Sequence, residues 1–247
     1  MEPDEYTRLA RYEQWYWWYV AQRETIARTI EMLGPRPKAK LLDAGCGTGQ
    51  CGALLAKRFK LEVFGVDASG HAAALWNGDS SIKRCVASIN TLPYSDSTFD
   101  LVLSMDVLDC CGVNQQRAVS EMARVLKLGG HVVLIVPAHP WLRSRHDQAV
   151  HSAGRFTRPA LTRLLATAGL VIEQMRHLFA ALLPLIVAKR LLDRLRSNRR
   201  PRSDLTALPA PLNRLLLAAA RFESRITQRV SMPFGSSILT VARRAHP

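Results

Sequence analysis

The sequence predicts a Rossmann-like α/β fold built on a mostly parallel sheet. Three observations lead to this prediction. An apolar run at 40–42 passes into glycines at alternate positions, a helical pattern follows directly, and short apolar runs then alternate with helical patterns up to residue 178. Strands that alternate with helices in this way form βαβ units, in which the strands are parallel.

Composition limits the class of protein. The 247 residues suffice for one α/β domain with an added lobe, and the formal net charge of +14 predicts an anionic partner without identifying it. The cysteines are odd in number and form no paired C-x-x-C motif, which favours the reduced cytoplasm over disulfides or a zinc site. The acidic first residues show no signal peptide, and no metal site is expected.

Residues 1–34 are expected to form one or two helices ahead of the core. The aromatic cluster at 15–19 is followed by Ile26, Ile30 and Leu33 at helical spacing, before Gly34 ends the helix. The cluster could pack onto the core, cover a ligand site, or rest on a membrane interface, where Trp and Tyr are favoured.

The glycine turn at 43–52 predicts a nucleotide-type cofactor. Glycines permit tight turns and let a ligand lie against the backbone, and the next helix then presents its N-terminus to the ligand. Residues 47–52 formally match G-x-G-x-x-G, and Asp67 ends the next strand where a ribose-binding acid is expected. However, Asp43 and Gly45 precede this fingerprint, whereas a dinucleotide turn usually follows an uninterrupted apolar strand.

The pattern Asp43-x-Gly45-x-Gly47-x-Gly49 resembles the class I S-adenosylmethionine-dependent methyltransferases. The resemblance implies a seven-stranded sheet with an antiparallel last strand, and S-adenosyl-L-methionine as the cofactor. The implied cofactor-binding residues near the turn and the second strand are Asp43, Gly45, Cys46, Gly47, Gly49, Asp67 and Ala68.

The resemblance continues through two later motifs and departs from the family at three positions. After a third strand at 82–87, Ser88 and Ile89 are implied adenine contacts, although Ser88 replaces the usual acid. The stretch 92–108 resembles the motif whose strand end, at Ser104 and Met105, faces the transferred methyl. Asp109-Cys110 stands where many relatives have Glu-His, and Leu128 replaces a proline in R-V-L-K-P-G-G.

The rest of the chain is expected to complete the sheet around an insertion. Helices are predicted at 118–126 and 159–168, and strands at 131–137, 170–178 and 237–242. More than fifty residues separate the last two strands, too many for a simple hairpin loop. We therefore expect an N-terminal cover (1–34), a core (35–178), an inserted basic helical lobe (179–233) and the last core strand (234–247). Within the lobe, helices are expected at 180–196 and 212–230, joined by a polar linker at 197–204.

Candidate catalytic residues follow the strand at 131–137. Loops after parallel strands hold substrate in such folds. His146 could deprotonate a hydroxyl acceptor with Asp147 beside it, or it could be an ordinary surface histidine. Arg143, Arg145 and Arg155 could hold an anionic substrate or form a solvated basic face.

These features predict a cytoplasmic methyltransferase that acts on a small-molecule or lipid-linked acceptor, with oxygen as the acceptor atom. A cofactor-binding but inactive partner protein and a nucleic-acid methyltransferase are the alternatives; only charge supports the latter. The apolar run 178–188 is too short to span a bilayer, which takes about 20 residues. Arginines follow it, including Arg194, Arg196, Arg199 and Arg200, so the lobe could bind an anionic membrane surface peripherally or simply cover substrate.

Overall fold

A seven-stranded sheet forms the centre of the computed structural model, which describes residues 3–76, 81–195, 207–227 and 232–245. The strand order is β3-β2-β1-β4-β5-β7-β6. β7 pairs antiparallel with β5 and β6, and the other pairings are parallel, which confirms the predicted fold class. The strands are β1 (Lys40–Ala44), β2 (Glu62–Asp67), β3 (Ile82–Val86), β4 (Phe99–Met105), β5 (Leu126–Pro137), β6 (Leu170–Leu178) and β7 (Ser237–Arg244).

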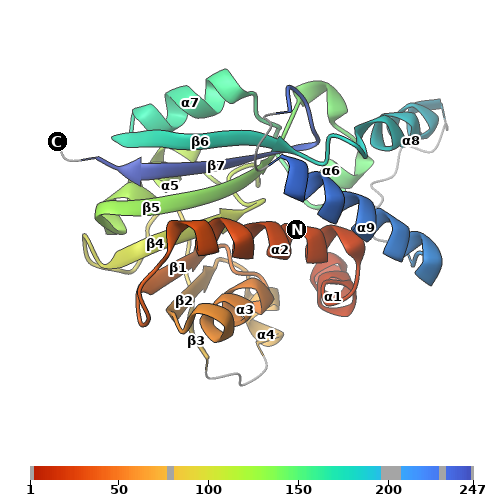
Figure 1. Cartoon of the computed structure of the whole chain (residues 1–247). Helices are drawn as coiled ribbons and strands as arrows, with labels where there is room; N and C mark the ends of the chain where they lie inside the picture. Colours follow the sequence, from red (N-terminus) through yellow and green to blue (C-terminus); the bar gives the residue numbers. More distant parts are fainter. Residues whose placement is uncertain (1–2, 77–80, 196–206, 228–231, 246–247) are drawn as a thin grey trace.

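Helices cover both faces of the sheet and gather at one end of it (Figure 1). They are α1 (Pro3–Tyr12), α2 (Trp17–Leu33), α3 (Gln50–Phe59), α4 (Gly70–Ala74), α5 (Gln115–Val125), α6 (Arg145–Ala149), α7 (Arg158–Ala166), α8 (Leu183–Leu195) and α9 (Ala210–Ile226). Figure 1 shows α1, α6, α8 and α9 on the right, where the parallel strands end. Ligands bind beyond the carboxyl ends of the strands in open α/β sheets, so this end of the molecule holds the candidate site.

Alternation along the strands divides the core into two clusters. Leu41 and Leu103 face α2, α3 and α9, whereas Leu42 and Val102 face α5 and α7. Side chains alternate between the faces of a strand, so a strand covered on both sides must be apolar throughout. The uninterrupted apolar runs of the sequence are therefore explained by burial on both faces.

Two elements differ from the sequence-based expectation. β5 begins at Leu126 rather than at residue 131, because Leu126 already pairs with Phe99 ahead of a register shift. α4 covers Gly70–Ala74, whereas the residue pattern predicts a helix that begins with 72–76.

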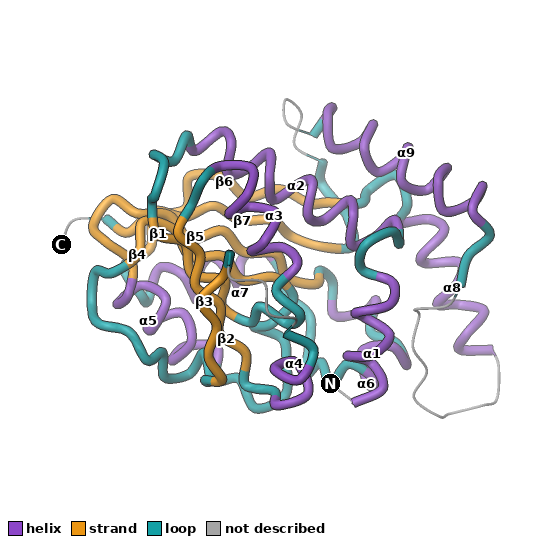
Figure 2. The backbone as a smooth tube through the Cα atoms, turned by 90° about the horizontal axis from the view of Figure 1, so that it is seen from below, coloured by secondary structure: helices purple, strands orange, loops and turns teal. Residues whose placement is uncertain are grey.

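The segment between β6 and β7 holds the two expected helices, α8 and α9. α9 lies along α2, as Figures 1 and 2 both show. The linker expected at 197–204 lies outside the described residues. Among the described helices, none combines the length and apolar character needed to cross a bilayer.

The N-terminal aromatic residues pack on the core, in agreement with the first of the three alternatives above. Tyr16 and Trp17 are buried, and Trp18 stacks on Phe179 with ring centroids 4.4 Å apart. Trp15 differs, because its side chain is exposed. The cluster thus fastens α2 to the segment that follows β6.

Candidate active site

The glycine turn links β1 to α3 in a conformation that favours glycine. Gly45, Gly47 and Gly49 have φ angles of 92°, 52° and 87°. A Cβ at Gly45 would clash with Val107 Cγ2, so Val107, the second residue after β4, packs directly on the turn. Any side chain at this position would separate the two segments.

Asp67 holds the turn from the end of β2. Its Oδ2 accepts a hydrogen bond from the Gly47 N–H at 2.8 Å, and its Oδ1 accepts one from the Ser69 N–H at 2.9 Å. Each carboxylate oxygen has a second lone pair, so the side chain can still accept from two ribose hydroxyls. Ala68, directly after it, is exposed on the rim.

Asp43 lies beneath the turn and is almost fully buried. Its Oδ2 has no hydrogen-bond partner. Burial first, and then the charge of Asp67, raise the pKa of Asp43 to about 7. A hydrogen bond with the Gly52 backbone partly offsets this rise in pKa, so only Oδ2 has capacity for a donor from a ligand or a bridging water.

The other predicted cofactor residues occupy different environments. Cys46 is buried in the turn, and burial raises the pKa of its thiol. The Ser88 hydroxyl accepts from the Asn90 N–H at 3.1 Å, and the Ile89 side chain packs in the core. Ser104 is buried and donates to the Ala44 carbonyl at 2.9 Å, which joins the ends of β4 and β1. Met105 packs at the edge of the core on the side of α2 and α3.

Helix α1 covers the turn. Leu9 Cδ2 lies 3.6 Å from the position of a Cβ on Gly47. The Thr48 hydroxyl donates to the carboxylate of Glu13, which follows α1, with distances of 2.8 and 2.7 Å to the two oxygens. Burial raises the pKa of the Tyr6 phenol, which lies near Ser69 and Asp67. Sequence reasoning predicted a cover but not these contacts, because they join segments with no shared motif.

Asp106 is a further candidate that motif matching missed. It follows β4 directly and adopts a positive φ of 53°. Gln22 Nε2 donates to its Oδ2 at 2.8 Å. Burial and then the neighbouring Asp109 raise the pKa of Asp106 to about 7, and burial and then Asp106 raise the pKa of the Tyr19 phenol. A carboxylate directly after a buried strand, beside a cofactor-type turn, is the signal that could have identified it.

His146 and Asp147 lie on α6, within the loop region after β5. Asp147 is buried and forms a capping box with Ser144. Its Oδ1 also accepts from Arg155 Nε at 2.9 Å, and Arg155 Nη1 donates to the Ala138 carbonyl at 3.2 Å. Asp147 and Arg155 therefore hold the loop together. The catalytic role of His146 stays a prediction.

Two further histidines meet near the ends of β5 and β6. The His139 and His177 rings stack at 5.3 Å with an interplanar angle of 11°. Burial and nearby Arg155 lower the pKa of His139, whose Nε2 has no hydrogen-bond partner. A neutral imidazole there could accept a proton or a hydrogen bond.

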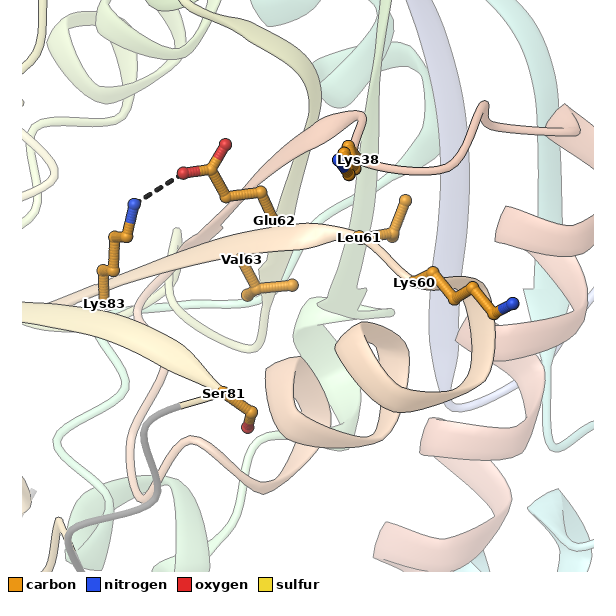
Figure 3. A pocket seen from close by; sticks show the side chains of 7 residues that line it. All are labelled: Lys38, Lys60, Leu61, Glu62, Val63, Ser81 and Lys83. Carbon is orange, nitrogen blue, oxygen red and sulfur yellow. Dashed lines mark hydrogen bonds and ion pairs between the residues drawn. The ribbon is translucent and has the colours of Figure 1, made fainter.

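The hollow drawn in Figure 3 lies away from this site. Its volume is about 310 Å³, and its lining comes from the segments that lead into β1, β2 and β3 and from the first residues of β2 and β3, where Lys83 pairs with Glu62. It therefore opens at the amino ends of the strands, opposite the glycine turn. Among the described residues, no group of three or more His, Cys, Asp or Glu side chains is placed to hold a metal ion.

Comparison with known proteins relates the chain to one family. Residues 42–134 match the model of a methyltransferase domain. Malonyl-[acyl-carrier protein] O-methyltransferase from Herminiimonas arsenicoxydans is 33% identical over 113 residues, which cover 45% of this chain and 42% of that protein. Squalene methyltransferase 1 from Botryococcus braunii is 32% identical over 141 residues, covering 51% of this chain and 36% of that protein.

A solved structure extends the likeness in fold to nearly the whole chain. Geranyl diphosphate C-methyltransferase from Streptomyces coelicolor A3(2), in a complex that contains S-adenosyl-L-homocysteine, superposes with a TM-score of 0.62 at 20% identity. The match covers 92% of this chain and 79% of that one. The chain spans less than half the length of the two curated relatives, so their substrates do not carry over directly.

Proposed function

This chain belongs to the class I S-adenosylmethionine-dependent methyltransferase family, and we propose that it transfers a methyl group to a small-molecule or lipid-linked acceptor, at an oxygen atom. The observation that carries the proposal is the joint geometry of Asp67 and the glycine turn. A carboxylate fixed by the Gly47 and Ser69 amides offers its remaining lone pairs to a ribose beside the turn.

The residues of the turn fit S-adenosylmethionine. We assign the ribose to Asp67, the methionyl end to the region of Asp43, and the adenine to the backbone near Ile89. The unpartnered Oδ2 of Asp43 gives a polar anchor, and Ala68 and Ser88 complete the rim. When bound, S-adenosylmethionine supplies a sulfonium methyl group open to in-line displacement.

The chain's own groups position the acceptor and exclude water. Helix α1 covers the turn through Leu9, and Glu13, directly after the helix, accepts from the Thr48 hydroxyl. We propose His146 as the base for an oxygen acceptor and Asp147 as the residue that fixes its helix. Asp106 is the alternative base, because it lies beside the turn and its pKa of about 7 suits proton transfer at neutral pH.

The acceptor class is proposed from surface chemistry and from the relatives. The names of three similar proteins specify a carrier-protein-linked acyl group, squalene and geranyl diphosphate, so apolar and carrier-linked acceptors occur among them. The exposed Leu185 and Leu191 of α8 would suit such an acceptor. We place the protein in the cytoplasm, peripherally on an anionic membrane; nucleic acid is the less favoured partner.

A two-part experiment tests the proposal. Calorimetry should show binding of S-adenosylhomocysteine, and mass spectrometry should show products heavier by one methylene after incubation with S-adenosylmethionine and carrier-linked, isoprenoid and phospholipid acceptors. Tight binding of NAD without a response to S-adenosylhomocysteine would contradict the cofactor assignment.

A second candidate function is a cofactor-binding partner protein without catalysis. The observation that favours it is the environment of the departures from the family pattern. Ser88 accepts a bond from the nearby Asn90 amide, and Asp109 is buried where relatives have glutamate. Binding of S-adenosylhomocysteine with no methylated product from any acceptor class would support this second function.

A further inference from the structure

The outer face of α9 is an apolar stripe that the described part of the chain leaves exposed. Leu215 and Phe222 are each 66% exposed, Leu212 is 42% exposed and Ile226 is 37% exposed. Residues three, four and seven apart share one side of a helix, so the four side chains form one continuous stripe. The opposite side of the same helix packs on the core through Leu216 and Ala220, among others.

The charged side chains that α9 itself exposes are all positive. α9 carries Arg214, Arg221 and Arg225, which are exposed. Its one acid, Glu223, is buried and accepts from the backbone N–H groups of Ala180 and Ala181 at 2.8 and 2.7 Å. Arg221 pairs with Glu24 of α2, and the chain as a whole has a net charge of +14. An apolar helix face bordered by arginines is the chemistry that binds an anionic lipid surface.

The same helix also contacts the segment that joins α1 to α2. Asn213 Oδ1 accepts from the Trp17 N–H, and Asn213 Nδ2 donates to the Trp15 carbonyl, both at 2.9 Å. Residues 13–16, here called the hinge, join α1 to α2, so one buried side chain holds the connection between the two helices. The exposed indole of Trp15 lies at this joint, and Trp is favoured at membrane interfaces.

The N-terminal cover, through α1 and Glu13, lies over the glycine turn. Leu9 packs on Gly47, and Glu13, at the start of the hinge, holds the Thr48 hydroxyl. A path of direct contacts therefore runs from the outer face of α9 through Asn213 and the hinge to the proposed cofactor site.

We propose that the outer face of α9, together with Trp15, docks on an anionic lipid bilayer. Through Asn213, docking moves the hinge and α1 away from the glycine turn, so that the cofactor can enter. This inference rests on the proposed function, because it concerns entry to the same cofactor site. A bilayer is favoured over a second copy of the chain because two copies of this face would bring like-charged arginines together. Apolar burial and lipid charge would act together on a bilayer.

Vesicle binding tests the docking surface. The wild type should bind vesicles that contain about 30 mol% phosphatidylglycerol at least about tenfold more tightly than neutral phosphatidylcholine vesicles, and added salt should release it. Leu215→Ser with Phe222→Ser, and separately Arg214→Ser with Arg225→Ser, should each weaken binding by about tenfold. The matched controls are Leu128→Ser, an exposed leucine at the start of β5, and Arg117→Ser, an exposed arginine on α5, and neither should change binding.

Equal binding to neutral and anionic vesicles, or binding unchanged by both α9 variants, would overturn the docking proposal. A dimer in light scattering that the Leu215 and Phe222 variant dissociates would assign the surface to a second copy instead. Failure of the wild type to bind S-adenosylhomocysteine both with and without vesicles would count against the proposed function, whereas failure to bind vesicles alone counts only against this inference.

The rate of cofactor entry tests the transmission. Anionic vesicles should raise the stopped-flow association rate of S-adenosylhomocysteine by at least about threefold in the wild type. Asn213→Ala should bind vesicles normally but show no such increase, and Asn213→Asp, which keeps one of the two bonds, should show part of it. If the rate is the same with and without vesicles in the wild type, or if Asn213→Ala keeps the full increase, the transmission is wrong.

Discussion

Gln22 Nε2 donates to Asp106 Oδ2 at 2.8 Å, and this bond joins the second helix of the cover to the residue that follows β4. The next residue, Val107, packs on Gly45 of the glycine turn. The cover, the end of β4 and the turn therefore meet at Asp106. Its position explains both the raised pKa of its carboxyl and its candidacy for contact with an acceptor.

Stability should depend on the proton of Asp106. Its pKa is about 7 in the folded chain, against about 3.9 in an unfolded one, so the folded state binds the extra proton between these values. This contribution to stability is present below about pH 4 and is lost as the pH rises through about 7. The free energy of unfolding of Asp106→Asn, relative to that of the wild type, should therefore rise by about 1–3 kcal/mol from about pH 5 to about pH 8.

Urea unfolding at both pH values measures this difference. Asp96→Asn is the matched control, because Asp96 is exposed and pairs with Arg124 on the surface. If the wild type and Asp106→Asn lose stability in parallel as the pH rises, the carboxyl of Asp106 titrates normally and its assignment as a neutral-pH base fails.

Asp67 should carry much of the cofactor affinity. Asp67→Ala is expected to weaken S-adenosylhomocysteine binding by about 2–3 kcal/mol, because charge-assisted bonds to the ribose are lost. It also removes the acceptor for the Gly47 and Ser69 N–H groups, so the turn should loosen. Calorimetry gives the affinity, and a melting curve by circular dichroism checks the fold. An affinity within about twofold of the wild type would place the ribose elsewhere.

The sequence could predict the sheet because local patterns determine it. Asp43, Gly45 and Asp67 lie at strand ends that apolar runs and glycines mark, and the structure has those strands. The contacts that complete the site are different in kind. Asn213 reaches Trp15 and Trp17 across almost the whole chain, and Gln22 reaches Asp106 with no motif in either segment. Such pairs follow from how helices dock on the finished sheet, which periodicity does not encode.

His146 and Asp147 should separate into a chemical and a structural role. His146→Ala is expected to lower turnover about 10²-fold with nearly unchanged cofactor affinity, if it removes the acceptor's proton. Asp147→Ala should instead destabilise the fold by about 3–5 kcal/mol, because it leaves Arg155 buried without its carboxylate. Turnover is measured on the acceptor found by mass spectrometry, and stability by urea unfolding. Unchanged turnover in His146→Ala would move the base to Asp106 or His139.

Glu223 should fasten α9 to the bend between β6 and α8. Its buried carboxylate accepts from the Ala180 and Ala181 N–H groups, and neither amide lies within a helix or strand that could satisfy it. Glu223→Ala should destabilise the chain by about 2–4 kcal/mol, because two buried donors lose a charged acceptor. Glu223→Gln keeps one acceptor oxygen, so about half of that loss is expected.

Urea unfolding gives the change in stability for the Glu223 variants, and hydrogen exchange at the Ala180 and Ala181 amides shows where it arises. Both amides should exchange faster in Glu223→Ala, while those of β4 change only in step with global stability. Arg225→Ala is the matched control on the same helix, because Arg225 is exposed. Exchange at Ala180 and Ala181 that follows only global unfolding in every variant would mean that the bend holds without α9, and that α9 is fastened mainly through Asn213 and its contacts with α2.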